Sequence, residues 1–417
     1  MERFDPGWLF GAVRRGVLDA LSEREPLVVA IDDTTSRKRG LKIPGAAWRR
    51  DPTGPHFSTN FIWGRRFLQL SAVLPAGKPC APGRAIPIAL HHAPSPKKPS
   101  KRDPPEAWAA YRTSSKAQSL TRQAVEELRL LREQMAGDGQ ASRPIRVVGD
   151  GGYTNKTVLR QLPPNAVFIG RIRSDAQLFQ SPLPGEKRGR GRRPSYGLAL
   201  PTPEQIRQDE SIPWSVCPVY AGGKVHSMKY KTVGPVLWRA AGADRPMQLV
   251  VVAPLAYRPT ARSKLLYRNP AYLVCTDPQL PAEAILPAYV SRWDIEVNFR
   301  DEKHLLGLDE AQVRNSNSAR TAPALAAGAY ALLLLAAHRA FGANGVPDAL
   351  PPPKWRRATK PPRASTALLM NHLRLELWGQ SLGTQNFSSL VDTHPPSPKP
   401  ENFIPCLSST LFYAQPH

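Results

Sequence analysis

Cysteine is scarce in this 417-residue sequence, which contains four: Cys80, Cys217, Cys275 and Cys406. They form no C-x-x-C pair and have no histidine at zinc-ligand spacing, which argues against structural zinc and agrees with a reducing compartment. The uncharged apolar run of ~18 residues that a membrane span needs is also missing. The nearest run, residues 321–337, contains Pro323 and predicts a buried helix instead. The N-terminus lacks the apolar segment of a secretory signal peptide.

Acidic residues are few compared with basic ones. The sequence has 33 Asp+Glu against 57 Lys+Arg, which gives a formal net charge of +24. Such a charge is unusual for a metabolic enzyme, because self-repulsion destabilises the compact state unless a polyanion compensates it. Because 41% of the residues are hydrophobic, the chain can bury a core and wholesale disorder is excluded. The composition therefore predicts a folded protein whose partner is nucleic acid.

The length predicts two or three domains at ~100–200 residues each. Residues 25–172 and 268–342 carry the strands and helices of an α/β core, beginning with the apolar run 27–31. Between them, residues 173–267 show short β-like pieces around the basic block 187–193, which predicts an inserted β-rich subdomain. Residues 343–417 predict a proline-rich basic tail with one helix near 365–378.

Three carboxylates occur where a metal site could form. Asp33 and Asp150 each follow a buried apolar run, and Glu296 lies within a helical pattern. Two acidic strand ends and one helical glutamate can converge on two divalent cations, which clamp the attacking and leaving oxygens of a phosphoryl transfer. The alternative for each aspartate is local hydrogen bonding in a turn.

A polar stripe surrounds the third carboxylate. On one helix, Tyr289, Arg292, Glu296 and Lys303 fall within an arc of roughly 60° between apolar margins. Such a stripe predicts an inward face, directed towards the core or a ligand. The alternative is a surface face with ion pairs between neighbouring turns.

Together these motifs resemble the DDE transposases of bacterial insertion sequences, in the group marked by a Y-(2)-R-(3)-E-(6)-K signature. The signature is matched by Tyr289-x2-Arg292-x3-Glu296-x6-Lys303 with every spacing kept. The first-aspartate and second-aspartate motifs are similar to residues 30–35 and 147–153. The resemblance covers roughly residues 25–340.

The resemblance implies an RNase H-like α/β core, a mixed sheet flanked by helices and interrupted by a β-rich insertion. It also implies a metal-dependent endonuclease and transposase whose catalytic and metal-binding residues are Asp33, Asp150 and Glu296, with Mg²⁺ as the cofactor and Mn²⁺ as a substitute. Of the neighbours Asp32 and Asp33, the motif places the catalytic carboxylate directly before the threonine pair, so Asp33 is expected. Asp32 is then a turn residue or supports the site from outside.

The implied partner is double-stranded DNA, both transposon ends and target, bound by a homodimer in the bacterial cytoplasm without a membrane. Arg292 and Lys303 would grip phosphates, and Tyr289 would hydrogen-bond a phosphate oxygen. A second basic group follows the first carboxylate and could meet the DNA backbone: Arg37, Lys38 and Arg39. Charge balance for Glu296 and a solvated loop are the respective alternatives.

The region before the first carboxylate is short compared with the family. Only 32 residues precede Asp33, whereas members of the group carry a longer N-terminal region that recognises the inverted repeats. Residues 1–24 are therefore interpreted as an N-terminal remnant. The alternative function is a truncated, non-catalytic DNA-binding remnant of such a transposase.

Overall fold

The computed structural model describes residues 5–51, 54–55, 57–75, 80–182, 194–258, 262–343 and 363–381. The chain divides into two units, the first formed by Met1–Leu74 and Arg84–Ala331 and the second by Pro75–Gly83 and Leu332–His417. The basic block 187–193 and most of the expected proline-rich tail lie outside the described residues.

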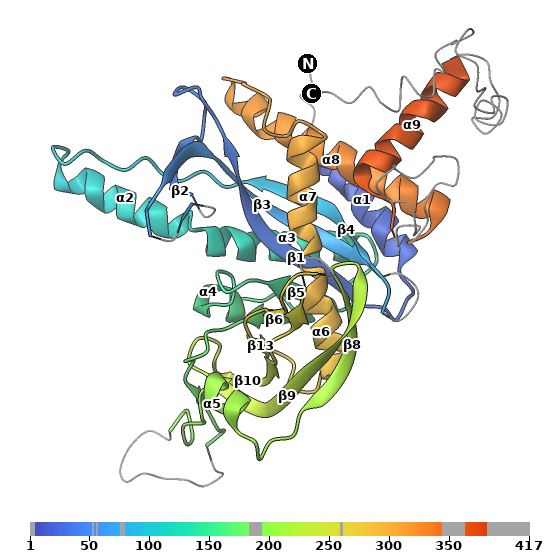
Figure 1. Cartoon of the computed structure of the whole chain (residues 1–417). Helices are drawn as coiled ribbons and strands as arrows, with labels where there is room; N and C mark the ends of the chain where they lie inside the picture. Colours follow the sequence, from blue (N-terminus) through green and yellow to red (C-terminus); the bar gives the residue numbers. More distant parts are fainter. Residues whose placement is uncertain are drawn as a thin grey trace. The chain divides into compact units, whose positions relative to one another are not determined.

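The first unit is built on a mixed sheet (Figure 1). Its first part has the order β4-β3-β1-β5-β6, formed by β4 (Arg84–His92), β3 (Phe61–Leu74), β1 (Leu27–Arg37), β5 (Ile145–Gly149) and β6 (Ala166–Arg171). β1 and β3 are antiparallel, as are β3 and β4, whereas β5 runs parallel to both β1 and β6. The expected strand at residues 27–31 is confirmed and extends to Arg37. This order is compatible with an RNase H-like domain.

The sheet continues beyond β6 through β13 (Ala271–Cys275), β10 (Gly242–Val252), β9 (Lys224–Trp238) and β7 (Leu178–Phe179). Two further strands pair at its sides: β2 (Ala47–Arg50) pairs with β3, and β8 (Ser215–Ala221) pairs with β9. Residues 173–267 are therefore rich in strands, as predicted, although they also contain the short helix α5 (Pro203–Gln208). Because β10 pairs with β13, these strands extend the central sheet rather than stand apart from it.

Helices cover both faces of this sheet. On one face α6 (Ala282–Ser291) and α7 (Asp294–His304) bury Ile285, Ile295 and Phe299 against Ala30 and Val148 of the sheet. On the other side α3 (Leu120–Gly137) packs on β3 and on the short α4 (Lys156–Leu159). A separate helix, α2 (Pro105–Ala117), precedes α3 and buries no residue.

The N-terminal residues form α1 (Pro6–Ala20), which starts at the side-chain cap of Asp5. Its apolar face, including Phe10 and Val13, is buried against β3 and β4. Residues expected to be a remnant thus contribute to the core of the first unit.

α8 (Ser316–Phe341) is the one helix of the described chain that is long and apolar enough to cross a bilayer, by length and composition alone. A core helix of a soluble protein passes the same test, and Ala324, Ala327 and Tyr330 of α8 are buried in the first unit. The expectation of a buried helix is therefore confirmed for the part of α8 that belongs to the first unit. In the second unit α9 (Thr366–Ser381) matches the helix expected near 365–378.

Candidate active site

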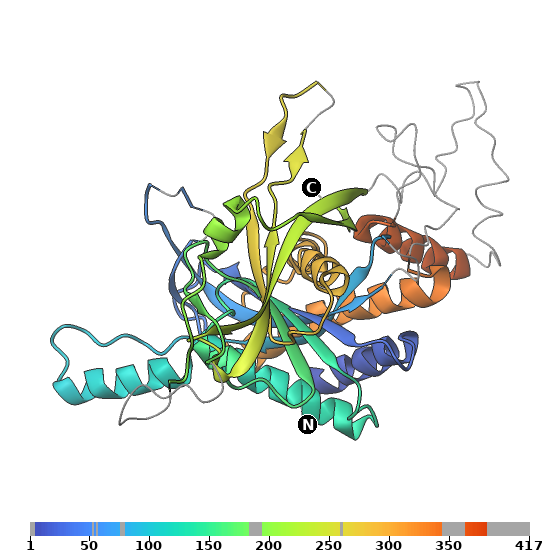
Figure 2. The same ribbon diagram turned by 90° about the horizontal axis from the view of Figure 1, so that it is seen from below.

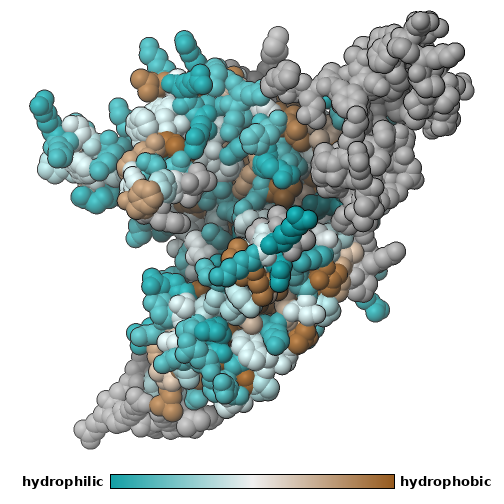
Figure 3. Space-filling view, in the orientation of Figure 1, coloured by the Kyte–Doolittle hydropathy of each residue, from teal (hydrophilic) through white to brown (hydrophobic). Residues whose placement is uncertain are grey.

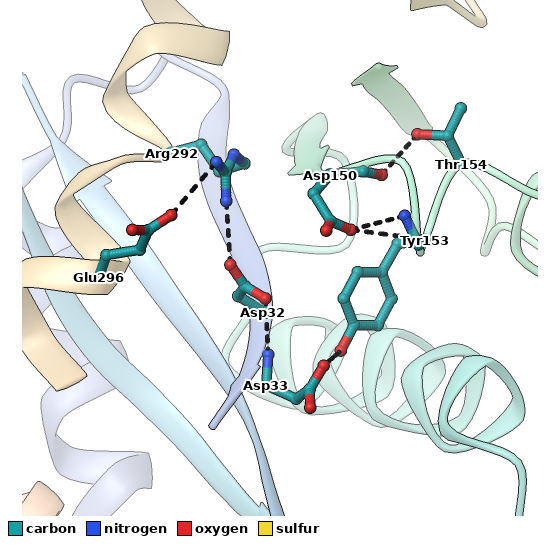
Figure 4. A network of polar contacts seen from close by, with 8 residues as sticks. Asp32, Asp33, Asp150, Tyr153, Thr154, Arg292 and Glu296 are labelled. Atoms are coloured by element: carbon teal, nitrogen blue, oxygen red, sulfur yellow. Dashed lines mark hydrogen bonds and ion pairs between the residues drawn. The ribbon is translucent and has the colours of Figure 1, made fainter. Parts of the chain in front are cut away.

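The two neighbouring aspartates of β1 point to different partners, because successive residues of a strand face opposite sides of the sheet (Figure 4). A carboxylate oxygen of Asp32 lies 2.9 Å from Nη1 of Arg292, on the side covered by α6 and α7. The Asp33 carboxylate instead accepts a hydrogen bond of 3.0 Å from the hydroxyl of Tyr153 and lies 3.4 Å from Nε of Arg66.

Arg292 joins the first carboxylate to the helical one. Its Nη2 lies 3.5 Å from Glu296, so one guanidinium bridges Asp32 and Glu296. The Arg292 side chain is only 11% exposed, whereas that of Glu296 is 40% exposed. The arginine is therefore fixed inside the site, and Glu296 remains accessible from solvent.

Asp150 follows the end of β5 in a tight turn. Its carboxylate accepts hydrogen bonds from the backbone N–H groups of Gly152, at 2.8 Å, and Tyr153, at 3.3 Å. Since the phenol of the same Tyr153 reaches Asp33, this residue connects Asp150 to β1 (Figure 4).

Gly149, the residue before Asp150, has no room for a side chain, because a Cβ there would lie 2.8 Å from the ring of Phe168.

Burial and mutual repulsion make the negative charges of this cluster unfavourable. Burial raises the pKa of Asp32 to about 7, although Arg292 and the N–H of Asp33 oppose the shift. Burial also raises the pKa of Asp33, against the effect of Arg66 and Tyr153. The charge of Asp150 adds to the increase in both pKa values. A cation placed among these groups would reverse this penalty.

The cluster supplies the right donor type for a divalent cation, since hard cations such as Mg²⁺ prefer carboxylate oxygens. Within the described residues, however, no group of three or more His, Cys, Asp or Glu side chains is close enough to hold one. The carboxylates are held in pairs, through Arg292 and through Tyr153, rather than converging on one point. The donor chemistry therefore suits a divalent cation, whereas the described geometry does not bring three of these ligands together.

Residues 110–332, more than half of the chain, match the family described as the transposase DDE domain. This chain belongs to the DDE transposase family. No curated protein matches it. Asp150, Arg292 and Glu296 lie inside the matched range, whereas both aspartates of β1 precede it. Family membership implies a protein that acts on DNA in transposition, with nuclease or transposase activity and divalent metal ions.

In this DDE transposase the Y-R-E-K residues do not share one straight helix. Tyr289 belongs to α6, and Glu296 and Lys303 belong to α7. Between them the backbone makes a tighter turn at Arg292 and Trp293. The N–H of Ile295 donates to the Arg292 carbonyl, and the N–H of Glu296 donates to the Trp293 carbonyl, so each hydrogen bond joins residues three apart. The prediction of a single helix was wrong at this junction, although Arg292 and Glu296 still meet.

The other signature residues lie at the edge of the carboxylate cluster. Tyr289 is half-buried, and burial raises its pKa against the charges of Arg292 and Arg171. Nζ of Lys303 donates to the Thr35 carbonyl of β1 at 3.0 Å. The Lys303 amine thus ties α7 to β1, and burial lowers its pKa.

The three basic residues after the first carboxylate have separate positions. Arg37 is exposed and pairs with Asp51 at 2.9 Å, and Arg39 is exposed. Lys38 differs from the expectation of a DNA contact, because its amine turns inward and donates to the carbonyls of Asp309 and Ala311. Only Arg37 and Arg39 present their charge to solvent.

A cleft of about 860 Å³ adjoins the Asp150 turn. Gly151 and Thr154 of the turn line one part of it, and Arg171 lines another. Asn269 and Pro270, just before β13, and Tyr272 within it also line this cleft, as do the acidic Asp175 and Glu204. The motif around Asp150 could have suggested Tyr153 as a site residue, whereas nothing in the spacing indicated Arg66 or Arg171.

Proposed function

We propose that this chain is a DNA transposase of the Y-R-E-K group of bacterial insertion sequences. It cleaves a phosphodiester at the transposon end and transfers the freed strand to target DNA. The observation that carries the proposal is the bridge of Arg292 between Asp32 and Glu296, with Asp150 close enough to raise the pKa of Asp32. Two carboxylates from separate elements of the family fold thereby share one arginine, and the charge of a third, Asp150, acts on Asp32.

We assign metal binding to Asp32, Asp150 and Glu296, and take Asp32 in place of the Asp33 that the motif favours. Asp32 lies on the side of α7 together with Glu296, whereas Asp33 is engaged by Tyr153 and Arg66. Bound Mg²⁺ would activate the attacking oxygen and stabilise the leaving one.

The remaining residues bind and orient DNA. Arg292 has a planar fork of donors that suits a phosphate, and it sits between two of the carboxylates. Tyr289 and the exposed Arg37 and Arg39 are assigned to contacts with the DNA strand, and Lys303 fixes α7 on β1. Residues 173–267 are taken as the family insertion, and the active assembly as a homodimer on two DNA ends.

The experiment is a metal-dependent nicking assay on duplex DNA at low salt, comparing wild type with Glu296→Gln. The matched control is Glu126→Gln, which changes a 71% exposed carboxylate of α3. We expect wild type and control to nick the duplex with Mg²⁺ or Mn²⁺, and Glu296→Gln to bind equally but cut at least about 100-fold more slowly.

If all three proteins bind DNA and none cuts it under any divalent metal, the enzymatic assignment is wrong. The chain would then be the non-catalytic DNA-binding protein. If Glu296→Gln cuts as fast as the control, the activity comes from elsewhere.

A further inference from the structure

A two-stranded arm interrupts the connection between two central strands. β10 ends at Val252 and β13 begins at Ala271, and these two residues pair in the sheet. Between them β11 (Ala256–Tyr257) and β12 (Leu266–Tyr267) pair only with each other. Figure 2 shows this ribbon projecting from the first unit. We call it the β11–β12 arm, meaning the described residues among 253–258 and 262–270.

The arm exposes apolar side chains that the rest of the described chain does not cover. Leu266 is 40% exposed and Tyr267 is 64% exposed. An isolated two-stranded ribbon is marginally stable in water, because it has no third layer to pack on. A partner that covers these side chains would therefore stabilise the arm, and the apolar surface buried in the contact would add to the affinity of the complex.

The charge of the arm identifies the chemistry of that partner. It carries four exposed cationic side chains: Arg258, Arg262, Lys264 and Arg268. The sequence contains no Asp or Glu between Asp244 and Asp277, so no acidic residue of the arm balances them. One guanidinium, that of Arg268, is stacked 5.0 Å from the ring centre of Tyr257. The cationic side chains of such a ribbon can bind the charges of a polyanion, and its aromatic and aliphatic side chains can contact apolar surface of the same partner.

The base of the arm lies at the cleft beside Asp150. Asn269 and Pro270, which lead from the arm into β13, line the same cleft as Gly151 and Thr154 of the Asp150 turn. Arg171 lies in that cleft and its guanidinium donates to the Pro270 carbonyl at 3.3 Å. DNA bound beside the Asp150 turn could thus pass the cationic Arg171 and Arg173 of this cleft, which also contains Asp175 and Glu204, and reach the arm.

We propose that the β11–β12 arm is a DNA-binding ribbon that enters a groove of duplex DNA beside the bond to be cut. β11 and β12 pair over two residues each, and the major groove, about 12 Å wide, admits a two-stranded ribbon. The cationic residues contact phosphates along the groove, and Leu266 and Tyr267 contact base edges. This inference rests on the proposed function, since it takes DNA to be the substrate.

The test measures duplex binding by fluorescence anisotropy over a range of salt concentrations, without metal. The arm variant replaces the four cationic residues with glutamine: Arg258→Gln, Arg262→Gln, Lys264→Gln and Arg268→Gln. The control has the same change in charge on exposed arginines of other segments: Arg15→Gln, Arg24→Gln, Arg122→Gln and Arg129→Gln. Thermal unfolding of both proteins checks that they remain folded.

We expect the slope of log K against log salt to fall by about 2 to 4 in the arm variant, because each lost phosphate contact removes about 0.9. The control should change the slope by less than about 1. As a second measurement on the unaltered chain, duplex DNA should slow amide hydrogen exchange at residues 256–258 and 264–268.

Equal slopes for the arm variant and the control, with no protection of the arm, would overturn the proposal. So would an arm variant that binds DNA as wild type does but loses self-association in sedimentation, which would identify the arm as a protein interface. If wild type itself fails to bind duplex, the proposed function fails, and that result is distinct from failure of the arm alone.

Discussion

At the scale of single residues, the site depends on which way one strand presents its two aspartates. Both Asp32 and Asp33 end the same apolar run, and both have a raised pKa because they are buried. Only Asp32 shares Arg292 with Glu296. The alternation of side chains along β1 therefore separates a group that can act with Glu296 from one held by Tyr153 and Arg66.

The two aspartates can be separated by single substitutions. We expect Asp32→Asn to slow metal-dependent cleavage at least about 100-fold, because it removes the carboxylate that shares Arg292 with Glu296. Asp33→Asn should keep measurable cleavage, since its carboxylate is engaged outside that pair. The assay is single-turnover nicking with both variants at equal DNA occupancy. The reverse order of effects would restore Asp33 as the ligand.

A second residue of interest is Glu302, which is fully buried on α7. Burial raises the pKa of Glu302 to about 8, although Gln69 and Lys303 act in the opposite direction. The folded state then keeps the proton between pH of about 4.5 and 8, while the unfolded chain releases it. Stability conferred by this group is therefore lost as the pH rises through that window.

Glu302→Gln should remove this loss. At pH 4 the variant and wild type should be similar in free energy of unfolding, because the wild-type side chain is neutral in both states. At pH 9 the variant should be more stable by about 5 kcal/mol. Urea unfolding at several pH values measures the difference, with the exposed Glu126→Gln as the control. A difference that does not grow with pH would show that Glu302 is ionised in the fold.

At the scale of elements, the end of β1 is fixed by lysines to the segments around α7. Nζ of Lys303 donates to Thr35, and Nζ of Lys38 donates to the carbonyls of Asp309 and Ala311. These bonds hold the helix that carries Glu296 against the strand that carries Asp32. Two lysines in a strongly basic protein thus serve the fold rather than the surface.

Lys38 and Arg39 form a matched pair for this distinction. Lys38→Met should lower the free energy of unfolding by about 1–3 kcal/mol, since two carbonyls lose their donor, and leave the salt dependence of DNA binding unchanged. Arg39→Met should leave stability unchanged and lower the salt slope by about 1 if this exposed arginine contacts a phosphate. Chemical unfolding and anisotropy measure the two effects. A change of slope in Lys38→Met alone would contradict the inward position of its amine.

At the scale of the whole chain, charge and fold have separate origins. The net charge of +24 is carried by residues scattered over the sequence, and hydrophilic side chains cover most of the surface of the first unit seen in Figure 3. The core of the first unit is made by the sheet, by the helices α1, α3, α6 and α7 and by the first half of α8. The family match from residue 110 to 332 takes in β5, β6, β13, α6 and α7, which supply Asp150, Arg292 and Glu296.

The sequence by itself determined the α/β class, the buried strand at residues 27–31, the strand-rich interval 173–267 and the spacing that led to the DDE transposase family. These features are local, because periodicity and motif spacing are written along the chain. Tertiary structure alone decided that Asp32 rather than Asp33 shares Arg292 with Glu296, that Lys38 turns inward and that β10 pairs with β13 of the central sheet. Each of these depends on contacts between residues far apart in the sequence, and no local pattern encodes which partner a side chain will find.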